Sequence, residues 1–508
     1  MSELPANWAT VMLCDAGTAI TGNTPATSNP ANYGQDLPFI KPPDLENRVI
    51  DSPQTFLSNE GATISRTLPP LAVLVTCIGN LGRVGISRTR VAFNQQINAV
   101  IPSAALDSFF LFYVAQSHAF RTQLESKASA TTISIVNKGN FEKIPIPLPP
   151  LPEQKRIVAK IEELFSELEA GEASLRKARR QLGVYRQSLL KQAFEGKLTS
   201  KWRTQNPDKL ESPASLLARI QSDRQAHYEK QLKEWEEAVK TWTSSGQKGK
   251  RSMKPSEPAT FATKAFEELE IPAGWAAEQI GNCPSDALIG LVRSSDEQHT
   301  GPTGFSYIKM DRVDMLGNAD VKADVFVDCT SDEVDRFALR KGDILFNTRN
   351  SVELVGKVGI VRRDPETPTV YNNNLMRLRL PGCIDPVFVG LQLCAHPFRQ
   401  RMEKVKKATT SVAAVYGKDF WPLPIVLCSL PEQQEIVHLL DEQYEAIERN
   451  ERELDAALQR SEALRQAILK KAFSGRLVPQ DPADEPASAL LARLRTERAA
   501  APTISKSR

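Results

Sequence analysis

The chain contains two copies of one long segment, and this duplication constrains its fold more than any other feature. Residues 151–199 and 430–478 align without a gap at a constant spacing of 279, and 19 of the 49 aligned positions are identical. Both copies begin with LPEQ and end with the pattern K-x-A-F-x-G-x-L. Such identity at a fixed spacing is the signature of an internal repeat. The chain is therefore expected to fold as two similar halves.

The repeat continues upstream of these segments, with spacings that grow in small steps. Small increments between matched segments are typical of loop insertions in a diverged copy. The matched pairs are LPANW (4–8) with IPAGW (271–275), PFIK (38–41) with SYIK (306–309), GRVGI (82–86) with GKVGI (356–360), and FNQQI (93–97) with YNNNL (371–375).

The duplicated segments are predicted to be long helices. Each begins with proline followed by glutamate, as helix starts do, and Gly196 and Gly475 are expected to end them in the left-handed conformation. Steps of four and three residues between apolar positions predict a coiled coil, and the simplest arrangement pairs the two helices of the chain with each other in antiparallel orientation. The alternative is that each helix packs only against its own domain. The expected apolar seam comprises Ile157, Ile161, Leu164, Leu168, Leu175, Leu182, Leu189, Ile436, Leu440, Ile447, Leu454, Leu464 and Ile468, with Tyr185 and the polar residues Gln443, Asn450 and Ser461.

The expected fold class is α+β, with two pseudo-repeated domains joined by two long helices that form an antiparallel coiled coil. Short β-like runs between Gly-, Pro- and Asn-rich loops favour small mixed domains. The predicted segments are a first domain (1–147), a first helix (148–200), a helical and flexible linker (201–270), a second domain (271–426), a second helix (427–478) and a tail (479–508).

Composition excludes several classes of protein. Lys and Arg number 64 against 61 Asp and Glu, so no strong basic excess announces nucleic-acid binding. The seven cysteines are scattered without a CxxC pair, which argues against a disulfide framework or a structural zinc site. No apolar run reaches the ~18 residues of a membrane helix, and the first residues do not resemble a secretory signal. A cytoplasmic protein without membrane contact is expected.

Motifs for catalysis are missing from the sequence. It contains no G-x-x-x-x-G-K-[ST] loop for ATP, and the glycines between Gly79 and Gly85 fit a turn better than a nucleotide-binding loop. The five histidines are isolated, so no metal site is expected. Asp107 with Glu125 and Lys127 has the composition of a nuclease site, although such triplets arise by chance in charged chains.

The duplicated helix starts, helix ends and Trp-containing domain starts resemble those of the specificity subunits of type I restriction–modification systems. The motifs are Pro145–Val158 and Pro424–Val437 at the helix starts, and the likeness spans nearly the whole chain. The resemblance implies two target-recognition domains that each read half of a split, asymmetric site in double-stranded DNA. It also implies two modification subunits that carry S-adenosylmethionine, and restriction subunits that use ATP and Mg²⁺. The specificity chain itself would bind no cofactor and perform no chemistry.

Base recognition requires Arg, Lys, Asn or Gln side chains on loops that reach the edges of the bases. The candidates are Lys41, Asn80, Arg83, Arg88, Arg90, Gln95 and Gln96 in the first domain, and Lys309, Arg349, Asn350, Lys357, Asn372, Asn373 and Asn374 in the second. For the residues 94–96 and 372–374, the alternative to base contact is a structural role in turns next to strands.

Two other functions compete with DNA recognition. In the first, the chain is a coiled-coil adaptor whose domains bind proteins and lack DNA specificity. In the second, Glu125 and Lys127 belong to a nuclease, which would cleave DNA alone in the presence of metal. Sequence-selective DNA binding by the assembled complex would separate the first from the specificity subunit.

Overall fold

The computed structural model describes residues 4–51, 53–129, 133–246, 253–262, 266, 269, 271–301, 303–322, 324–409 and 412–500. Parts of the predicted linker (201–270) and the end of the predicted tail (501–508) therefore lie outside the described residues. The chain divides into two compact units. Unit 1 comprises Met1–Lys177 with Glu453–Arg508, and unit 2 comprises Ala178–Arg452.

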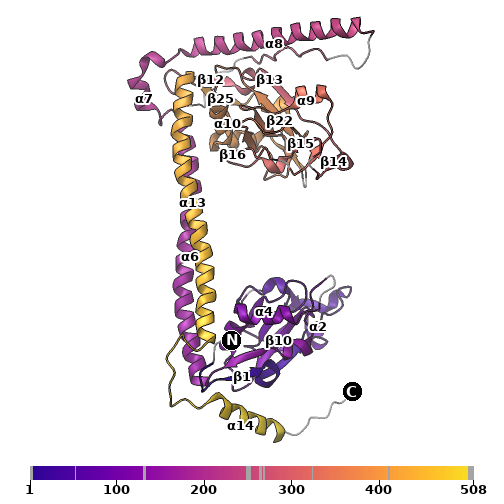
Figure 1. Ribbon diagram of the computed structural model, residues 1–508, viewed down its shortest axis with the longest axis vertical. Helices are drawn as coiled ribbons and strands as arrows, with labels where there is room; N and C mark the ends of the chain where they lie inside the picture. Colours follow the sequence, from indigo (N-terminus) through magenta and orange to yellow (C-terminus); the bar gives the residue numbers. More distant parts are fainter. Residues whose placement is uncertain are drawn as a thin grey trace. The chain divides into compact units, whose positions relative to one another are not determined.

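Unit 1 is built on two larger sheets and one two-stranded sheet (Figure 1). Its five-stranded sheet has the order β2 (Gly17–Thr21), β10 (Ile97–Pro102), β7 (Val73–Thr76), β8 (Val84–Ser87), β4 (Arg48–Ile50). Its four-stranded sheet has the order β5 (Phe56–Leu57), β3 (Tyr33–Ile40), β9 (Val91–Phe93), β6 (Thr67–Leu68), and β1 (Ala9–Met12) pairs with β11 (Pro145–Leu148). The helices are α1 (Leu13–Ala16), α2 (Asn59–Thr63), α3 (Ser108–Gln116), α4 (His118–Ser126), α5 (Lys138–Glu142) and α14 (Ala487–Ala500), with 3-10 turns η1 (Pro30–Asn32) and η2 (Pro42–Asp44).

Unit 2 repeats the five-stranded sheet and the two-stranded pairing of unit 1, whereas its second sheet differs in its edge strands, and this mixture of helices and sheets confirms the α+β fold class. Its five-stranded sheet has the order β13 (Asp286–Ile289), β22 (Leu375–Arg379), β18 (Ile344–Asn347), β20 (Val358–Ile360), β16 (Gly317–Asn318). The second sheet has the order β14 (Gln298–His299), β17 (Phe326–Val327), β15 (Phe305–Ile308), β21 (Thr369–Tyr371), and a two-stranded sheet pairs β12 (Ala276–Gln279) with β25 (Pro424–Leu427). A small sheet adds β19 (Arg349–Asn350), β24 (Ala413–Ala414) and β23 (Lys407–Ala408). The helices include α7 (Ser200–Gln205), α8 (Pro213–Ser244), α9 (Ser331–Phe337), α10 (Pro386–Cys394), α11 (His396–Val405) and α12 (Gly417–Phe420), with η6 (Met310–Arg312) among the 3-10 turns.

One almost wholly apolar helix lies in the core of each unit. The sequence of α3 is SFFLFYVAQ and that of α10 is PVFVGLQLC, and six and seven of their nine residues are buried. Asp107 and Asp385 cap these helices by accepting hydrogen bonds from backbone N–H groups of the first turn. A helix that is apolar on all sides is stable only in a core, so these two helices anchor the sheets around them.

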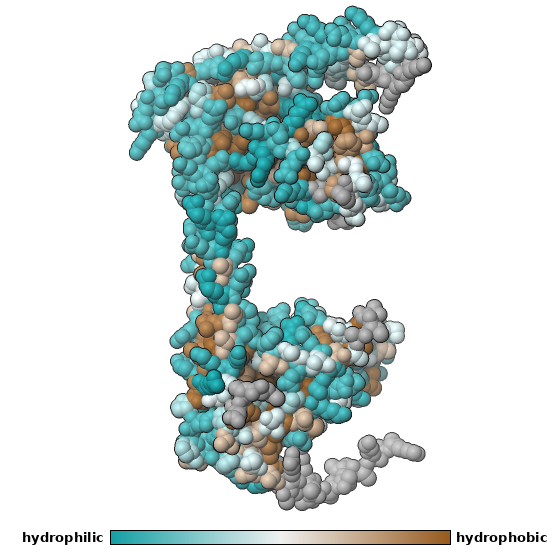
Figure 2. Space-filling view, viewed as in Figure 1, coloured by the Kyte–Doolittle hydropathy of each residue, from teal (hydrophilic) through white to brown (hydrophobic). Residues whose placement is uncertain are grey.

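The two long helices are α6 (Leu151–Phe194) and α13 (Leu430–Phe473), and they pair antiparallel (Figure 1). In unit 1 the start of α6 meets the end of α13, where Ser461 donates a hydrogen bond of 2.7 Å to Glu172. In unit 2 the end of α6 meets the start of α13, where Tyr185 donates to Gln443 at 3.2 Å. The face of the pair that is visible in Figure 2 is mostly hydrophilic. Gly196 and Gly475 end the helices with φ of 66° and 72°, as predicted.

The seam between the helices departs from the predicted heptads near the end of α13. Leu464, expected at the seam, is 50% exposed, and Arg465 lies over the ring of Phe165 at 4.4 Å instead. Asn450, another predicted seam residue, is also exposed. A straight helix with 3.6 residues per turn drifts from a strict seven-residue repeat. The buried face therefore moves one position along the chain. Buried seam residues are Ile157, Ile161, Leu189, Ile436, Leu440, Ile447 and Ile468, whereas Leu164, Leu168, Leu175, Leu182 and Leu454 are half-buried.

The duplicated LPEQ motif attaches each helix start to its domain. The Gln154 side chain accepts a hydrogen bond from the Asp107 backbone, and Gln433 does the same for Asp385. The preceding glutamate is buried in both copies. Glu432 accepts hydrogen bonds from Thr199, Arg203 and the Trp275 indole. These donors stabilise the ionised carboxylate.

Glu153 occupies the matched position in unit 1, but no arginine among the described residues forms an ion pair with it, since the nearby Arg156 pairs with Asp484 at 2.7 Å. It is fully buried near Trp8 and Asn7, and its oxygens, the Trp8 indole nitrogen and Oδ1 of Asn7 all lack hydrogen-bond partners among the described residues. Burial raises the pKa of the Glu153 carboxyl above its ordinary value of 4.5. A protonated carboxyl group has one donor for Asn7 and one acceptor for Trp8.

We expect Glu153→Gln to stabilise unit 1 progressively as the pH rises. The folded state holds the Glu153 proton more tightly than the unfolded state, so this contribution to stability is lost as the pH rises through the folded-state pKa. Glutamine keeps a donor and an acceptor at every pH. Calorimetric unfolding of the full chain should show a gain of about 1–3 kcal/mol near pH 8, the penalty of unsatisfied buried groups, and little gain near pH 5. The matched control, Glu432→Gln, should destabilise unit 2. A Glu153→Gln effect that does not change with pH would contradict the expectation.

Among the described residues, no helix combines the length and the apolar character needed to cross a bilayer.

Candidate nucleic-acid interface

Four of the predicted DNA-binding residues converge in one cleft of unit 1. The cleft has a volume of about 400 Å³, and its walls include Lys41, Asn80, Arg83 and Gln96. They come from three connections: the turn after β3, the loop between β7 and β8, and the loop between β9 and β10. These segments lie 55 residues or fewer apart in sequence, but only the pairing of the strands brings their ends together. Asn94, which the sequence suggested only as a turn residue, also lines the cleft.

The loop between β7 and β8 presents Asn80 and Arg83 on a rigid turn. Gly79 and Gly82 have φ of 77° and 79°, which favour glycine. The Thr76 hydroxyl donates to the Asn80 carbonyl at 2.6 Å and accepts from the Arg83 backbone N–H at 2.9 Å. Both side chains are exposed, and neither forms a hydrogen bond or ion pair with any residue that the structure describes. They are therefore available to an external ligand.

Three other candidates in unit 1 already have partners within the domain. Arg88 forms an ion pair of 3.0 Å with Asp51, Arg90 donates to Thr67 at 3.3 Å, and Gln95 accepts a hydrogen bond from Thr24. None of the three is among the residues that line the cleft. Their contacts support a role in holding loops in place.

Unit 2 places its candidates at the same ends of the equivalent strands. Lys309 follows β15, the residues 372–374 follow β21, and Lys357 precedes β20. Backbone hydrogen bonds join these ends: Thr348 N–H donates to the Asn374 carbonyl at 2.9 Å, and Asn347 N–H to the Lys357 carbonyl at 2.8 Å. The candidates of unit 2 therefore lie at neighbouring strand ends, where Asn372 is buried and Lys309, Lys357, Asn373 and Asn374 are half-buried.

The candidates of unit 2 differ in how firmly the domain holds them. Asn350 donates to Asn347 at 2.9 Å and caps the Ser351 N–H, which indicates a structural role. Asn374 contacts Met310 through its amide nitrogen. Arg349, Lys357, Lys309 and Asn373 have no side-chain hydrogen bond or ion pair with the described residues. These four are the better candidates for ligand contact.

Two of the residues proposed for a nuclease site have structural roles instead. Asp107 caps α3, and Glu125 pairs with Arg121 at 2.9 Å on α4. Within the described residues, no group of three His, Cys, Asp or Glu side chains is placed to hold a metal ion. Burial raises the pKa of Cys77, next to the cleft of unit 1, to about 12, so this thiol is not a nucleophile at neutral pH.

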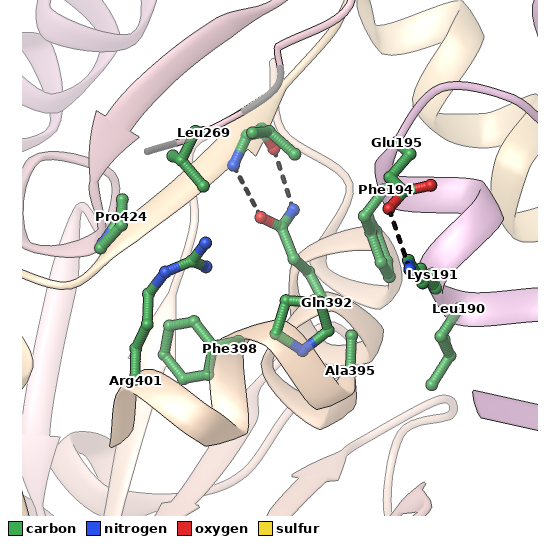
Figure 3. A pocket seen from close by; sticks show the side chains of 12 residues that line it. Leu190, Lys191, Phe194, Glu195, Leu269, Gln392, Ala395, Phe398, Arg401 and Pro424 are labelled. Atoms are coloured by element: carbon green, nitrogen blue, oxygen red, sulfur yellow. Dashed lines mark hydrogen bonds and ion pairs between the residues drawn. The ribbon is translucent and has the colours of Figure 1, made fainter. Parts of the chain in front are cut away.

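A second cavity, of about 380 Å³, lies in unit 2 where the end of α6 packs against α10 and α11 (Figure 3). Gln392 crosses its floor and exchanges hydrogen bonds with the Val426 backbone at 2.6 and 2.9 Å. Lys191 and Glu195 form an ion pair of 3.7 Å at its rim. None of the predicted DNA-binding residues lines this cavity. It belongs to the junction between helix and domain.

Comparison with known proteins identifies the family. A family model described as the type I restriction modification DNA specificity domain matches residues 5–175. The chain is 25% identical to the type I restriction enzyme EcoKI specificity subunit of Escherichia coli K12, over 98% of this chain and 97% of that protein. Residues 5–175 therefore carry the DNA specificity domain of this family, and the chain is similar to a type I specificity subunit over nearly its whole length.

Other similarities agree with a specificity subunit. The HindI specificity subunit of Haemophilus influenzae is 34% identical over 172 residues, which cover 32% of this chain and 37% of that protein. A solved structure titled for complex assembly and conformational transition of the type I R-M system aligns with a TM-score of 0.64 at 18% identity, over 94% of this chain and all of that chain. This likeness shows a shared fold.

Proposed function

We propose that this specificity subunit reads a split, asymmetric site in double-stranded DNA, one half with each unit, and performs no chemistry itself. The observation that carries the proposal is the cleft in unit 1, where Lys, Asn and Arg side chains without an ion pair or side-chain hydrogen bond to any described residue meet on rigid loops. Such side chains supply the hydrogen bonds that distinguish bases in the major groove. The same strand ends in unit 2 carry a different set of polar residues, which suits a site whose halves differ in sequence.

The repeat also supports the assembly of two modification subunits on one chain. Gln466 accepts a hydrogen bond from the His118 N–H in unit 1, and Gln187 accepts one from the His396 N–H in unit 2. Both units thus join a long helix to the start of a domain helix in the same way. A partner that recognises this junction once would find it twice on the chain. Restriction subunits, with their ATP and Mg²⁺, would then join the modified complex.

The test is methylation-sensitive long-read sequencing of the source genome, with the gene present, deleted, or replaced by a variant. We expect a split adenine-methylated motif that disappears on deletion. Arg83→Ala should relax the motif at one base pair or abolish methylation, because a bidentate arginine contact contributes about 1–3 kcal/mol to discrimination between bases.

Arg88→Ala is the matched control, because it removes the same charge from a side chain that already pairs with Asp51. It should leave the motif unchanged. A genome whose methylated motifs are identical with and without the gene, in cells that express active modification subunits, would favour the adaptor function instead.

A further inference from the structure

One lysine recurs in both units with the same surroundings. Lys41 follows β3 and Lys309 follows β15, and each immediately precedes a 3-10 turn. Their backbone angles agree closely, with φ and ψ of −118° and 163° for Lys41, and −105° and 172° for Lys309. The preceding strands pair in parallel with β9 and β21 in the same register. The position of this lysine is therefore built identically in two diverged domains.

An asparagine beside each lysine fixes the strand end that carries it. Asn94 donates its backbone N–H to the Ile40 carbonyl at 3.0 Å, and Asn372 donates to the Ile308 carbonyl at 2.9 Å. A glycine presses against each asparagine: a Cβ atom on Gly22 or Gly290 would lie only 2.2 or 2.3 Å from its carbonyl oxygen. This close packing leaves the strand end little freedom, so the lysine is presented from a rigid support.

The fold itself gives neither lysine an ionic partner. Neither Lys41 nor Lys309 forms an ion pair with a residue in the described part of the chain. Both are half-buried, and the Lys41 ammonium lies 5.8 Å from the centre of the buried Phe39 ring. Holding a cation in place without a carboxylate costs side-chain entropy and some desolvation. An external anion would offset this cost.

The polar residues around the lysines differ between the two copies. Exposed Asn80 aligns with Leu354, and Gln95 and Gln96 align with Asn373 and Asn374. Arg83 and Lys357 share a charge, but the planar guanidinium of arginine presents a fixed fork of donors, whereas the lysine ammonium is a compact point charge on a flexible stem. The two halves of an asymmetric DNA site differ in their bases and have the same sugar–phosphate backbone. Residues kept the same in both readers should contact what both half-sites share, and residues that differ should read the bases.

We infer that Lys41 and Lys309 each bind a DNA phosphate and form a matched pair of backbone contacts, one in each half-site. This inference rests on the proposed function. The two lysines position the duplex against each domain, whereas Asn80, Arg83 and the other unmatched residues determine the sequence. Lys41 lies in the same cleft as Asn80 and Arg83, so a phosphate bound there would bring the adjacent base edges within their reach.

The experiment measures DNA binding by the full chain assembled with its modification subunits. The probes are a short duplex with the motif found by sequencing, the same duplex with single base pairs replaced, and a random-sequence duplex. Dissociation constants are recorded between about 50 and 200 mM KCl. For Lys41→Ala and for Lys309→Ala we expect the same fold-loss on every duplex, and a slope of log affinity against log salt that falls by about 0.9. The double variant should lose about twice that slope.

Two matched variants complete the design. Lys138→Ala removes a lysine of unit 1 that pairs with Glu142 at 3.3 Å, and it should leave the slope unchanged. Asn80→Ala should leave the slope unchanged and lose discrimination at one base pair. A lysine variant that alters base preference, or that keeps the wild-type slope while the wild type still selects its motif, overturns the inference. A wild-type complex that binds motif and random duplexes equally overturns the proposed function instead.

Discussion

Replacing Arg203 with methionine is expected to destabilise unit 2 by about 3–5 kcal/mol, the largest effect of any single substitution considered for this unit. Glu432 is 1% exposed and lies 2.5 Å from the Arg203 guanidinium. Removing the arginine leaves a buried carboxylate with two neutral donors, Thr199 and the Trp275 indole. An uncompensated buried charge carries a large desolvation penalty, whereas methionine preserves most of the packing volume.

Calorimetric unfolding of the full chain should show the transition of unit 2 lowered by on the order of 10 °C, with the transition of unit 1 in place. Adding Glu432→Gln to Arg203→Met should recover much of the loss, because the buried charge is then gone. Lys230→Met is the control, since Lys230 and Glu234 form an exposed pair that contributes little. A loss of under 1 kcal/mol for Arg203→Met would show that the pair does not hold the helix start.

Phe165→Ala is expected to destabilise unit 1 by about 3–5 kcal/mol, as truncations of buried phenylalanine do. Phe165 is 5% exposed on α6, packs edge-to-face on Tyr113 at 5.7 Å, and receives Arg465 of α13 on its ring. The substitution therefore removes one contact to the domain and one to the partner helix. It also exposes the Arg465 side chain to a cavity.

Leu464→Ala tests whether Leu464 contributes to the interface between the two long helices. The heptad pattern places Leu464 at the helix interface, but it is half-exposed, so we expect its truncation to cost under about 1 kcal/mol. Calorimetry and copurification with the modification subunits provide the two measurements. If both substitutions reduced the free energy of unfolding by the same amount, Leu464 would lie at the helix interface as the strict heptad pattern predicts.

Local patterns predicted the long helices well. Pro–Glu at each start and glycine at each end are signals that act within a few residues, and α6 and α13 begin and end where these signals lie. The seam was predicted less accurately. Which side of a helix is buried at Leu464 depends on the drift of the real helix and on the large Phe165 ring opposite, and neither follows from the spacing of apolar residues.

For the candidate site, too, the sequence predicted the residue types but not their arrangement in space. Lys41, Asn80, Arg83 and Gln96 were predictable as polar loop residues in duplicated segments, because their types suit base and phosphate contacts. Their convergence in one cleft was not predictable, since it depends on how β3, β7 and β9 pair in two sheets. The structure also distinguishes Arg83 from Arg88, because within the described part of the chain Arg88 has a carboxylate partner and Arg83 has none.

The sequence by itself determined the duplication, the two long helices and the class of side chain available to DNA, because these depend on residue identity and short-range periodicity. Only the tertiary structure decided which of those side chains are free, and which of the two matched glutamates at the helix starts is paired. Glu153 and Glu432 sit in the same motif, yet one faces Asn7 and the other Arg203. The reason is physical: burial and electrostatic pairing arise from neighbours that are distant in the chain, and the fold alone places them.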